Sequence, residues 1–120
     1  MMKIEKTSYG PWNEAYRCTM GQSELIVVTE IGPRVMSVRH AGGPNFLFND
    51  LAGKIHREDW YIRGGHRFWV APETEDTYHT DNQPAQVQLE EGAITITCAP
   101  QACGAQKILR ISATACGQGF

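Results

Sequence analysis

A dense run of polar and aromatic side chains lies in the middle of the chain. From Arg63 to Pro84 the sequence reads RGGHRFWVAPETEDTYHTDNQP, with two glycines, two histidines, two arginines and a tryptophan among several carboxylates. Guanidinium groups recognise carboxylates, phosphates and sugar hydroxyls, a tryptophan ring offers an apolar face, and glycines let the backbone approach a ligand closely. No apolar periodicity runs through the stretch, so we expect it to form the rim of a site.

Each of these side chains also has an ordinary structural role. A loop histidine such as His66 is more often a solvated surface group than a catalyst. Trp69 alternates like a strand residue and fits the core equally well. Arg67 can pair with Glu73, with Asp81 or with an anionic group of a ligand. Residue types alone therefore leave both kinds of role open.

A metal site is a further interpretation of the same stretch. His66, Glu73, His79 and Asp81 offer nitrogen and oxygen ligands, of which the carboxylates would favour calcium and the histidines zinc. The four cysteines form no C-x-x-C pair and fit no zinc spacing. We expect them to be free thiols packed in strands, and we expect no cofactor.

The composition describes one globular domain. The chain has 120 residues, of which 42% are hydrophobic and 20% charged, and a formal net charge of −2; this length is enough for a single core. A slightly acidic chain offers no basic patch for nucleic acid. The first residues lack the apolar run of a secretory signal, and no segment approaches the apolar length that spans a bilayer. We therefore expect a cytoplasmic protein without nucleic-acid or membrane partners.

The elements that must position the central stretch alternate with period two, which is typical of half-buried strands. We expect strands over residues 16–20, 24–30, 34–40 and 107–115, and a hairpin over 85–99 that turns at 90–92. The residues predicted to face inward are Ile26, Val28, Met36, Val38, Leu89, Ile94, Ile96, Leu109 and Ile111. This pattern predicts an all-β, antiparallel fold.

One charged residue falls on an apolar face of these strands. In GPRVMSVRH, Arg34 shares the face of Met36 and Val38. An arginine in that position needs a partner or a wet cavity. Of the two, we favour half of a buried ion pair.

The strands are interrupted by a long interval over residues 41–85. Within it, HREDWYI (56–62) fits a single helical turn, and Glu75 and Asp76 fit a solvated turn. An interval this long inside a compact β domain is usually functional.

The last turn of the sequence leads to no further strand. After residue 115 the chain reads CGQG and stops at Phe120, whereas all-β sandwiches often reach about 200–250 residues. We expect residues 1–120 to be the N-terminal portion of a single, larger antiparallel β-sandwich. A sheet edge left open in this way would favour self-association.

Two segments resemble the galactose mutarotase-like (aldose 1-epimerase) superfamily of large sugar-binding β-sandwiches, and most closely its DUF4380-type branch. EIGPRVMSVRHAGGPNFLFND (30–50) is similar to the family's opening hairpin, in which a glycine-arginine strand precedes an N-x-F/L-F turn. RGGHRFWVAPETEDTYHTDNQP is similar to the GGHR-x-W-x-APE…Y…DN signature of that branch, and its RGG to the Arg-Gly-Gly of the hexose-6-phosphate epimerase branch. The likeness runs from about Ser23 to the end of the chain, and the central motif is its specific part.

The resemblance implies a carbohydrate ligand and a role for each residue of the central stretch. Arg63 would hold a ring or substituent oxygen, His66 would be the proton donor or a hydroxyl ligand, and Trp69 would carry the sugar ring. The other substrate-binding residues implied in this way are Arg67, Glu73, His79 and Asp81. We expect Arg63, His66, Arg67 and Glu73 to share one concavity, with Trp69 beside it.

Mutarotation requires a base that removes the O1 proton and an acid that protonates the ring oxygen, on opposite sides of the sugar. In the superfamily the base is a glutamate from late in the chain, so it is expected beyond Phe120. The family's His-Gly acid motif is replaced here, since Thr80 follows His79. Three functions therefore stay open: an aldose 1-epimerase-like isomerase, a non-catalytic sugar-binding domain and the metal site.

Overall fold

The computed structural model describes residues 1–120 and consists of short antiparallel strands with one short helix. The elements in chain order are β1 (Lys3–Tyr9), β2 (Trp12–Met20), β3 (Ser23–Val28), β4 (Arg34–His40), β5 (His56–Arg57), β6 (Trp60–Tyr61), β7 (His66–Arg67), α1 (Glu75–Thr80), β8 (Gln86–Glu90), β9 (Ala93–Thr97) and β10 (Ile108–Ser112). The predicted all-β, antiparallel class is confirmed. No helix has the length and apolar character needed to cross a bilayer.

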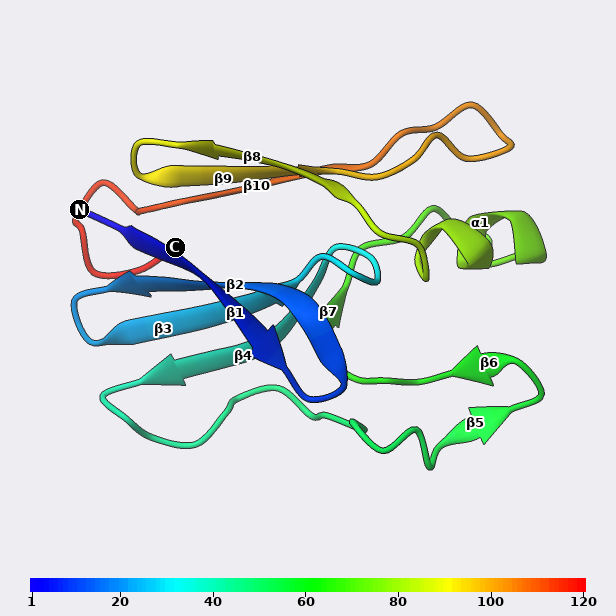
Figure 1. Ribbon diagram of the computed structural model, residues 1–120, viewed down its shortest axis with the longest axis horizontal. Coiled ribbons are helices and arrows are strands. Elements are labelled where there is room, and N and C mark those ends of the chain that lie inside the picture. The colour runs from blue at the N-terminus through cyan, green and yellow to red at the C-terminus, as the bar shows by residue number, and fades with distance from the viewer.

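Two sheets carry most of the chain. A five-stranded sheet has the order β1-β2-β3-β4-β7, a three-stranded sheet has the order β10-β9-β8, and β5 and β6 form a separate hairpin. In Figure 1 the three-stranded sheet lies above the five-stranded sheet, and α1 and the β5–β6 hairpin project toward the same end of the molecule. That end carries the central stretch of the sequence.

The larger core cluster lies between the two sheets. Val27 of β3 faces it, and Ile94 and Ile96 of β9 meet it from the other sheet. Because successive side chains of a strand point to opposite faces, Ile26 and Val28 belong to a second cluster on the other side of the five-stranded sheet. The alternating apolar residues of the strands thus form two apolar layers. The larger cluster packs between the two sheets, and the second lies on the other side of the five-stranded sheet.

Most of the predicted core residues are buried. Val38 and Leu109 are partly buried and pack against the larger cluster, whereas the prediction for Leu89 is wrong, because this side chain is 54% exposed. Leu89 lies on β8, the edge strand of its sheet, next to the turn into β9. The buried members of the predicted set are Ile26, Val28, Met36, Ile94, Ile96 and Ile111.

Three local predictions differ from the structure. Glu75 and Asp76 are exposed, as expected of a solvated turn, but they form the first turn of the helix α1. The segment HREDWYI forms the β5–β6 hairpin rather than a helical turn, with His56 paired to Tyr61 and Arg57 to Trp60. The His56 and Tyr61 rings stack at 5.2 Å between centroids. The N-terminal residues, for which no strand was predicted, form β1 along the edge of β2.

Leu89 is exposed whereas its cross-strand partner Ile94 is buried, and this difference predicts different effects of substitution on stability. We expect Leu89→Ala to change the free energy of unfolding by about 0.5 kcal/mol or less, as for other exposed positions. Ile94→Val, which removes one buried methylene, should cost about 0.5–1.5 kcal/mol. Urea unfolding of both variants measures these changes. A loss of unfolding free energy well above about 0.5 kcal/mol for Leu89→Ala would mean that β8 is covered in solution.

Candidate functional site

The short strand β7 connects the central stretch to the five-stranded sheet. It pairs antiparallel with the start of β4, so that Arg67 stands opposite Arg34 and His66 opposite Val35. Residues directly opposite each other in a sheet have neighbouring side chains on the same face. Two guanidinium groups are therefore brought to one place, while His66 takes the other face and is exposed.

A buried ion network lies beside this pair. The Asp81 carboxylate, 2% exposed, accepts a hydrogen bond from Arg67 Nε at 2.7 Å and is in contact with Lys107 Nζ. Lys107 is 3% exposed, and its Nζ also donates to the carbonyl oxygen of Phe68 at 2.7 Å. Because one carboxylate serves two cations from β7 and from the approach to β10, the network ties the two sheets to the end of α1.

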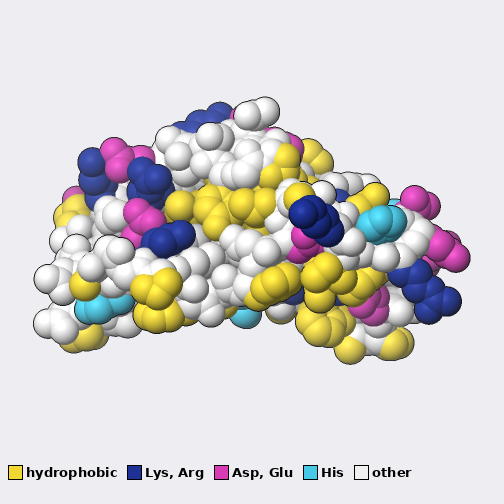
Figure 2. Space-filling view, turned by 90° about the horizontal axis from the view of Figure 1, so that it is seen from below, with side chains coloured by type: hydrophobic (Ala, Val, Ile, Leu, Met, Phe, Trp, Pro, Cys, Tyr) yellow, Lys and Arg dark blue, Asp and Glu magenta, His cyan; other side chains and the backbone are white.

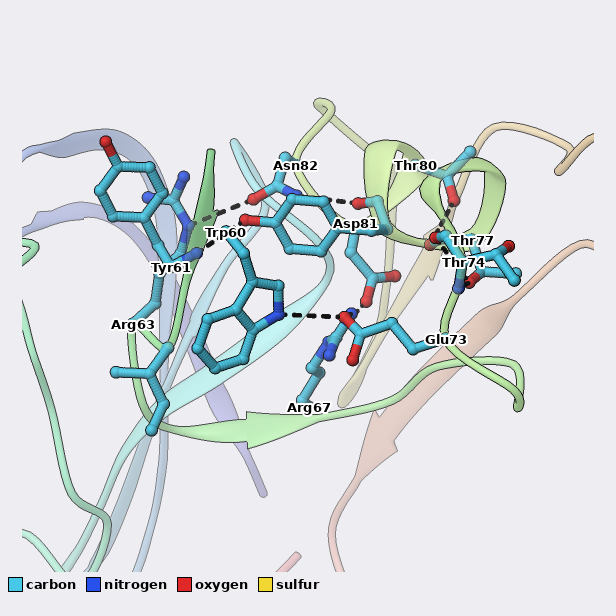
Figure 3. Close-up of polar contacts among 12 residues, drawn as sticks. Trp60, Tyr61, Arg63, Arg67, Glu73, Thr74, Thr77, Thr80, Asp81 and Asn82 are labelled. Atoms are coloured by element: carbon cyan, nitrogen blue, oxygen red, sulfur yellow. Dashed lines mark hydrogen bonds and ion pairs between the residues drawn. The ribbon is translucent and has the colours of Figure 1, made fainter. Parts of the chain in front are cut away.

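Glu73 extends the network toward the surface. Its Oε1 lies 2.7 Å from Arg67 Nη2 and accepts a hydrogen bond from Trp60 Nε1 at 3.2 Å (Figure 3). The Arg67 guanidinium holds the pKa of Glu73 below its usual value. Burial disfavours the charge of Arg67, but its pairs with Glu73 and Asp81 outweigh this effect, so that the pKa of Arg67 is raised. Both groups therefore stay ionised around neutral pH.

Trp60 lines two cavities at this end of the molecule. The first, which we call the helix cavity, has a volume of about 280 Å³ and lies between the β5–β6 hairpin and α1. The residues lining it are Arg57, Glu58, Asp59, Trp60, Glu73, Thr74, Glu75, Tyr78 and His79. Figure 2 shows apolar, basic and acidic side chains mixed at this end of the surface.

The second cavity, which we call the arginine cavity, has a volume of about 300 Å³. The residues lining it are Arg34, Phe48, Trp60, Tyr61, Ile62, Gly64, Gly65 and Arg67. It combines aromatic and aliphatic walls with two guanidinium groups. A volume of this size is at the lower end of the range of small-molecule sites.

Arg34 is 3% exposed and is not part of the ion pair that its sequence position suggested. Its Nη1 donates to the carbonyl oxygens of Ile62 at 3.3 Å and Gly64 at 3.0 Å, and its buried Nε has no partner. Burial, together with the nearby charge of Arg67, lowers the pKa of Arg34 to about 10. The prediction of a buried ion pair is therefore wrong; the buried carboxylate of this region, Asp81, pairs with Arg67 and Lys107 instead.

Two glycines make the floor of the arginine cavity possible. Gly64 and Gly65 have φ of +86° and +76°, values that residues with a side chain rarely adopt. A Cβ on Gly64 would lie 2.2 Å from the carbonyl oxygen of Phe48, and one on Gly65 would lie 2.5 Å from that of Val35. The backbone of the central stretch thus approaches the backbone of Phe48 and of Val35 more closely than any side chain allows.

The Tyr78 hydroxyl fastens the β5–β6 hairpin to α1. It accepts a hydrogen bond from the Tyr61 N–H at 2.9 Å and donates to the carbonyl oxygen of Asp59 at 3.0 Å. The helix itself begins with a capping box, in which Thr77 Oγ1 accepts from the Thr74 N–H. The contacts of Tyr78 hold the hairpin that carries Trp60, which lines both cavities.

The structure brings together part of the predicted site. Arg67, Glu73 and Asp81 form one network, and Glu73 and His79 line the helix cavity. Trp69 is 45% exposed, so it is not a core residue, and it lies under the Arg67 guanidinium at 4.9 Å without lining either cavity.

Two residues predicted to share the concavity are not among those that line the cavities. His66 lines neither of them. Arg63 donates from Nε to Asn82 Oδ1 at 3.2 Å and stacks over the Tyr61 ring at 5.1 Å, but it also lines neither. The single concavity expected for Arg63, His66, Arg67 and Glu73 is therefore not formed.

Three residues of this site were not identified from the sequence as parts of it. Trp60 belongs to a segment that was interpreted as a helical turn, and Lys107 begins an alternating strand. For Arg34, an ion pair was favoured over the cavity position that it occupies. No group of three or more histidine, cysteine, aspartate or glutamate side chains is placed to hold a metal ion. The set His66, Glu73, His79 and Asp81 does not converge on one point.

Comparison with known proteins adds no family to this description: no protein-family model, curated protein or solved structure matches the chain. Evidence about function therefore comes from the side chains around Trp60. They offer an exposed indole face, forked cations and ionised carboxylates within two adjoining cavities.

Proposed function

We propose that the chain binds a carbohydrate at the two cavities on either side of Trp60, as part of a β-sandwich of the galactose mutarotase-like kind. The observation that carries the proposal is Trp60 itself, whose indole is held by Glu73 and borders both cavities. A sugar ring has apolar C–H faces and a rim of hydroxyls. An aromatic face flanked by guanidinium and carboxylate groups suits both features.

Binding is favoured over interconversion of anomers. A general base works best when its pKa lies near the operating pH, whereas Arg67 holds the pKa of Glu73 below its usual value. Glu73 in this state is a good acceptor for hydroxyl groups and a weak base. His79, which lines the same cavity, would then contribute a hydrogen bond to the ligand.

We expect Trp60→Ala to weaken binding of the preferred sugar by at least about tenfold, which corresponds to about 1.4 kcal/mol. The measurement is isothermal titration calorimetry with a panel of hexoses, hexose phosphates and uronic acids. Phe46→Ala is the matched control, because this aromatic side chain is 67% exposed and lines neither cavity. If the two variants bind alike, the site lies elsewhere; if nothing in the panel binds, the carbohydrate proposal is wrong.

The same titration tests the residues implied by the family resemblance. His66→Ala and Trp69→Ala remove side chains outside both cavities, and Trp60→Ala removes one inside. A loss of affinity confined to Trp60→Ala would place the sugar in the cavities. A loss confined to His66→Ala and Trp69→Ala would favour the surface that carries these two side chains.

A further inference from the structure

The arginine cavity contains one guanidinium group, that of Arg34, which forms no ion pair with a carboxylate of the chain. Arg34 is 3% exposed and bonds only to two backbone carbonyls, and its Nε faces no acceptor. Removing a cation from water costs several kcal/mol unless a partner compensates it. A neutral carbonyl compensates less than an anion does. The burial of Arg34 without an anionic partner therefore destabilises the folded chain.

The carboxylates nearby are already engaged. Asp81 is shared by Arg67 and Lys107, and Glu73 is shared by Arg67 and Trp60. The cluster thus places Arg34, Arg67 and Lys107 against two carboxylates, which leaves one positive charge in excess.

The placement of the two arginines adds an independent observation. Arg34 and Arg67 are direct partners in the β4–β7 register, and both line the arginine cavity. Like charges directly opposite each other across two strands are destabilising. The charge of Arg67 contributes, after burial, to the lowered pKa of Arg34, which at about 10 still leaves Arg34 protonated at neutral pH. An anion in the cavity would remove this repulsion and supply the missing acceptor.

We propose that the arginine cavity binds an anionic group of the ligand, a carboxylate or a phosphate, so that the sugar taken by this chain is an acidic one. The inference rests on the proposed carbohydrate function and names the class of sugar. Guanidinium groups match the planar or forked oxygens of either anion. The sugar ring then extends from the arginine cavity past Trp60 toward the helix cavity.

The test compares ligands that differ in charge and little else. Calorimetry on residues 1–120 would use glucuronate, galacturonate and glucose 6-phosphate, with glucose, galactose and glucuronamide as neutral counterparts and inorganic phosphate and acetate as anions without a ring. We expect at least one acidic sugar to bind ten or more times tighter than its neutral counterpart. Whether the uronates or the phosphate ester bind tighter distinguishes a carboxylate site from a phosphate site.

The other outcomes separate this inference from the proposed function. Equal or tighter binding of the neutral sugars would overturn the anion site and leave carbohydrate binding intact. Binding of phosphate or acetate as tight as that of every acidic sugar would keep the anion site and overturn the carbohydrate function. Binding of none of the probes would overturn both.

A pair of variants tests the residue that carries the inference. Arg34→Met removes the buried charge at similar volume and should reduce the preference for acidic over neutral sugar to less than about threefold. Arg110→Met is the matched control, because Arg110 is exposed on β10, pairs with Glu90 and should leave the preference unchanged. A preference retained in Arg34→Met contradicts the proposal. If Arg34→Met does not fold, the comparison of glucuronate with glucuronamide on the unchanged chain decides.

Discussion

Asp81→Asn is expected to lower the free energy of unfolding by about 3–5 kcal/mol, because it leaves buried cations without their shared carboxylate. Asp81 contacts both Arg67 and Lys107, and Lys107 is 3% exposed with only the Phe68 carbonyl as its other partner. Burial makes the effect large, since an uncompensated charge in the interior loses its hydration. Urea unfolding followed by tryptophan fluorescence measures the change.

The control for this prediction is an ion pair of the same type on the surface. Glu90 pairs with Arg110 on the exposed side of the three-stranded sheet, so Glu90→Gln should cost no more than about 1 kcal/mol. Adding Lys107→Met to Asp81→Asn removes the stranded cation and should recover part of the loss. The account fails if Asp81→Asn is as mild as Glu90→Gln, or if the double variant is less stable than Asp81→Asn alone.

Gly64→Ala is expected to cost about 3 kcal/mol or more. The residue combines a φ of +86° with a Cβ position only 2.2 Å from the Phe48 carbonyl oxygen. Backbone strain of this kind costs about 1–3 kcal/mol, and forcing extra atoms into a packed site costs a similar amount. The substitution should also distort the arginine cavity, because Gly64 and Phe48 both line it.

The chain offers a matched control for this prediction. Gly104 has the same φ of +86°, but nothing lies within 4 Å of the position of its Cβ. Gly104→Ala therefore reports the backbone strain alone, about 1 kcal/mol, and the difference between the two variants measures the clash. Equal losses in denaturant unfolding would show that the close approach of Gly64 to Phe48 is relaxed in solution.

The strands of the fold could be predicted from the sequence because alternation survives in β3, β4, β9 and β10. The prediction fails where a side chain's surroundings depend on position in the sheet: Leu89 alternates correctly, yet β8 is an edge strand and leaves it exposed. The β5–β6 hairpin was missed because strands of two residues are too short to show a period. Periodicity indicates which face of a strand is apolar, but it does not indicate which strands lie beside that strand in the sheet.

The same limit applies to the candidate site, where contacts between residues distant in the sequence could not be predicted. Arg67, Glu73 and Asp81 lie close together in the sequence, and their pairing was foreseen as one of several alternatives. Lys107 enters the network across 26 residues, and no local pattern indicates that a lysine at the start of a strand is buried. His66 was expected in the site, but it directly precedes Arg67 in β7, and the alternation of a strand places it on the opposite face. Long-range contact, which the sequence does not display, decided the burial of Lys107.

The hairpin that presents Trp60 stands outside both apolar core clusters, neither of which includes a residue of 56–61. Its tethers are the Tyr78 hydroxyl and the Trp60–Glu73 hydrogen bond. Surface segments that are held by a few hydrogen bonds outside the core accept substitutions without changing the packing of the sheets. Ligand preference can therefore diverge among descendants of this chain through changes in a few hairpin residues, while the sheets and the buried network are inherited intact.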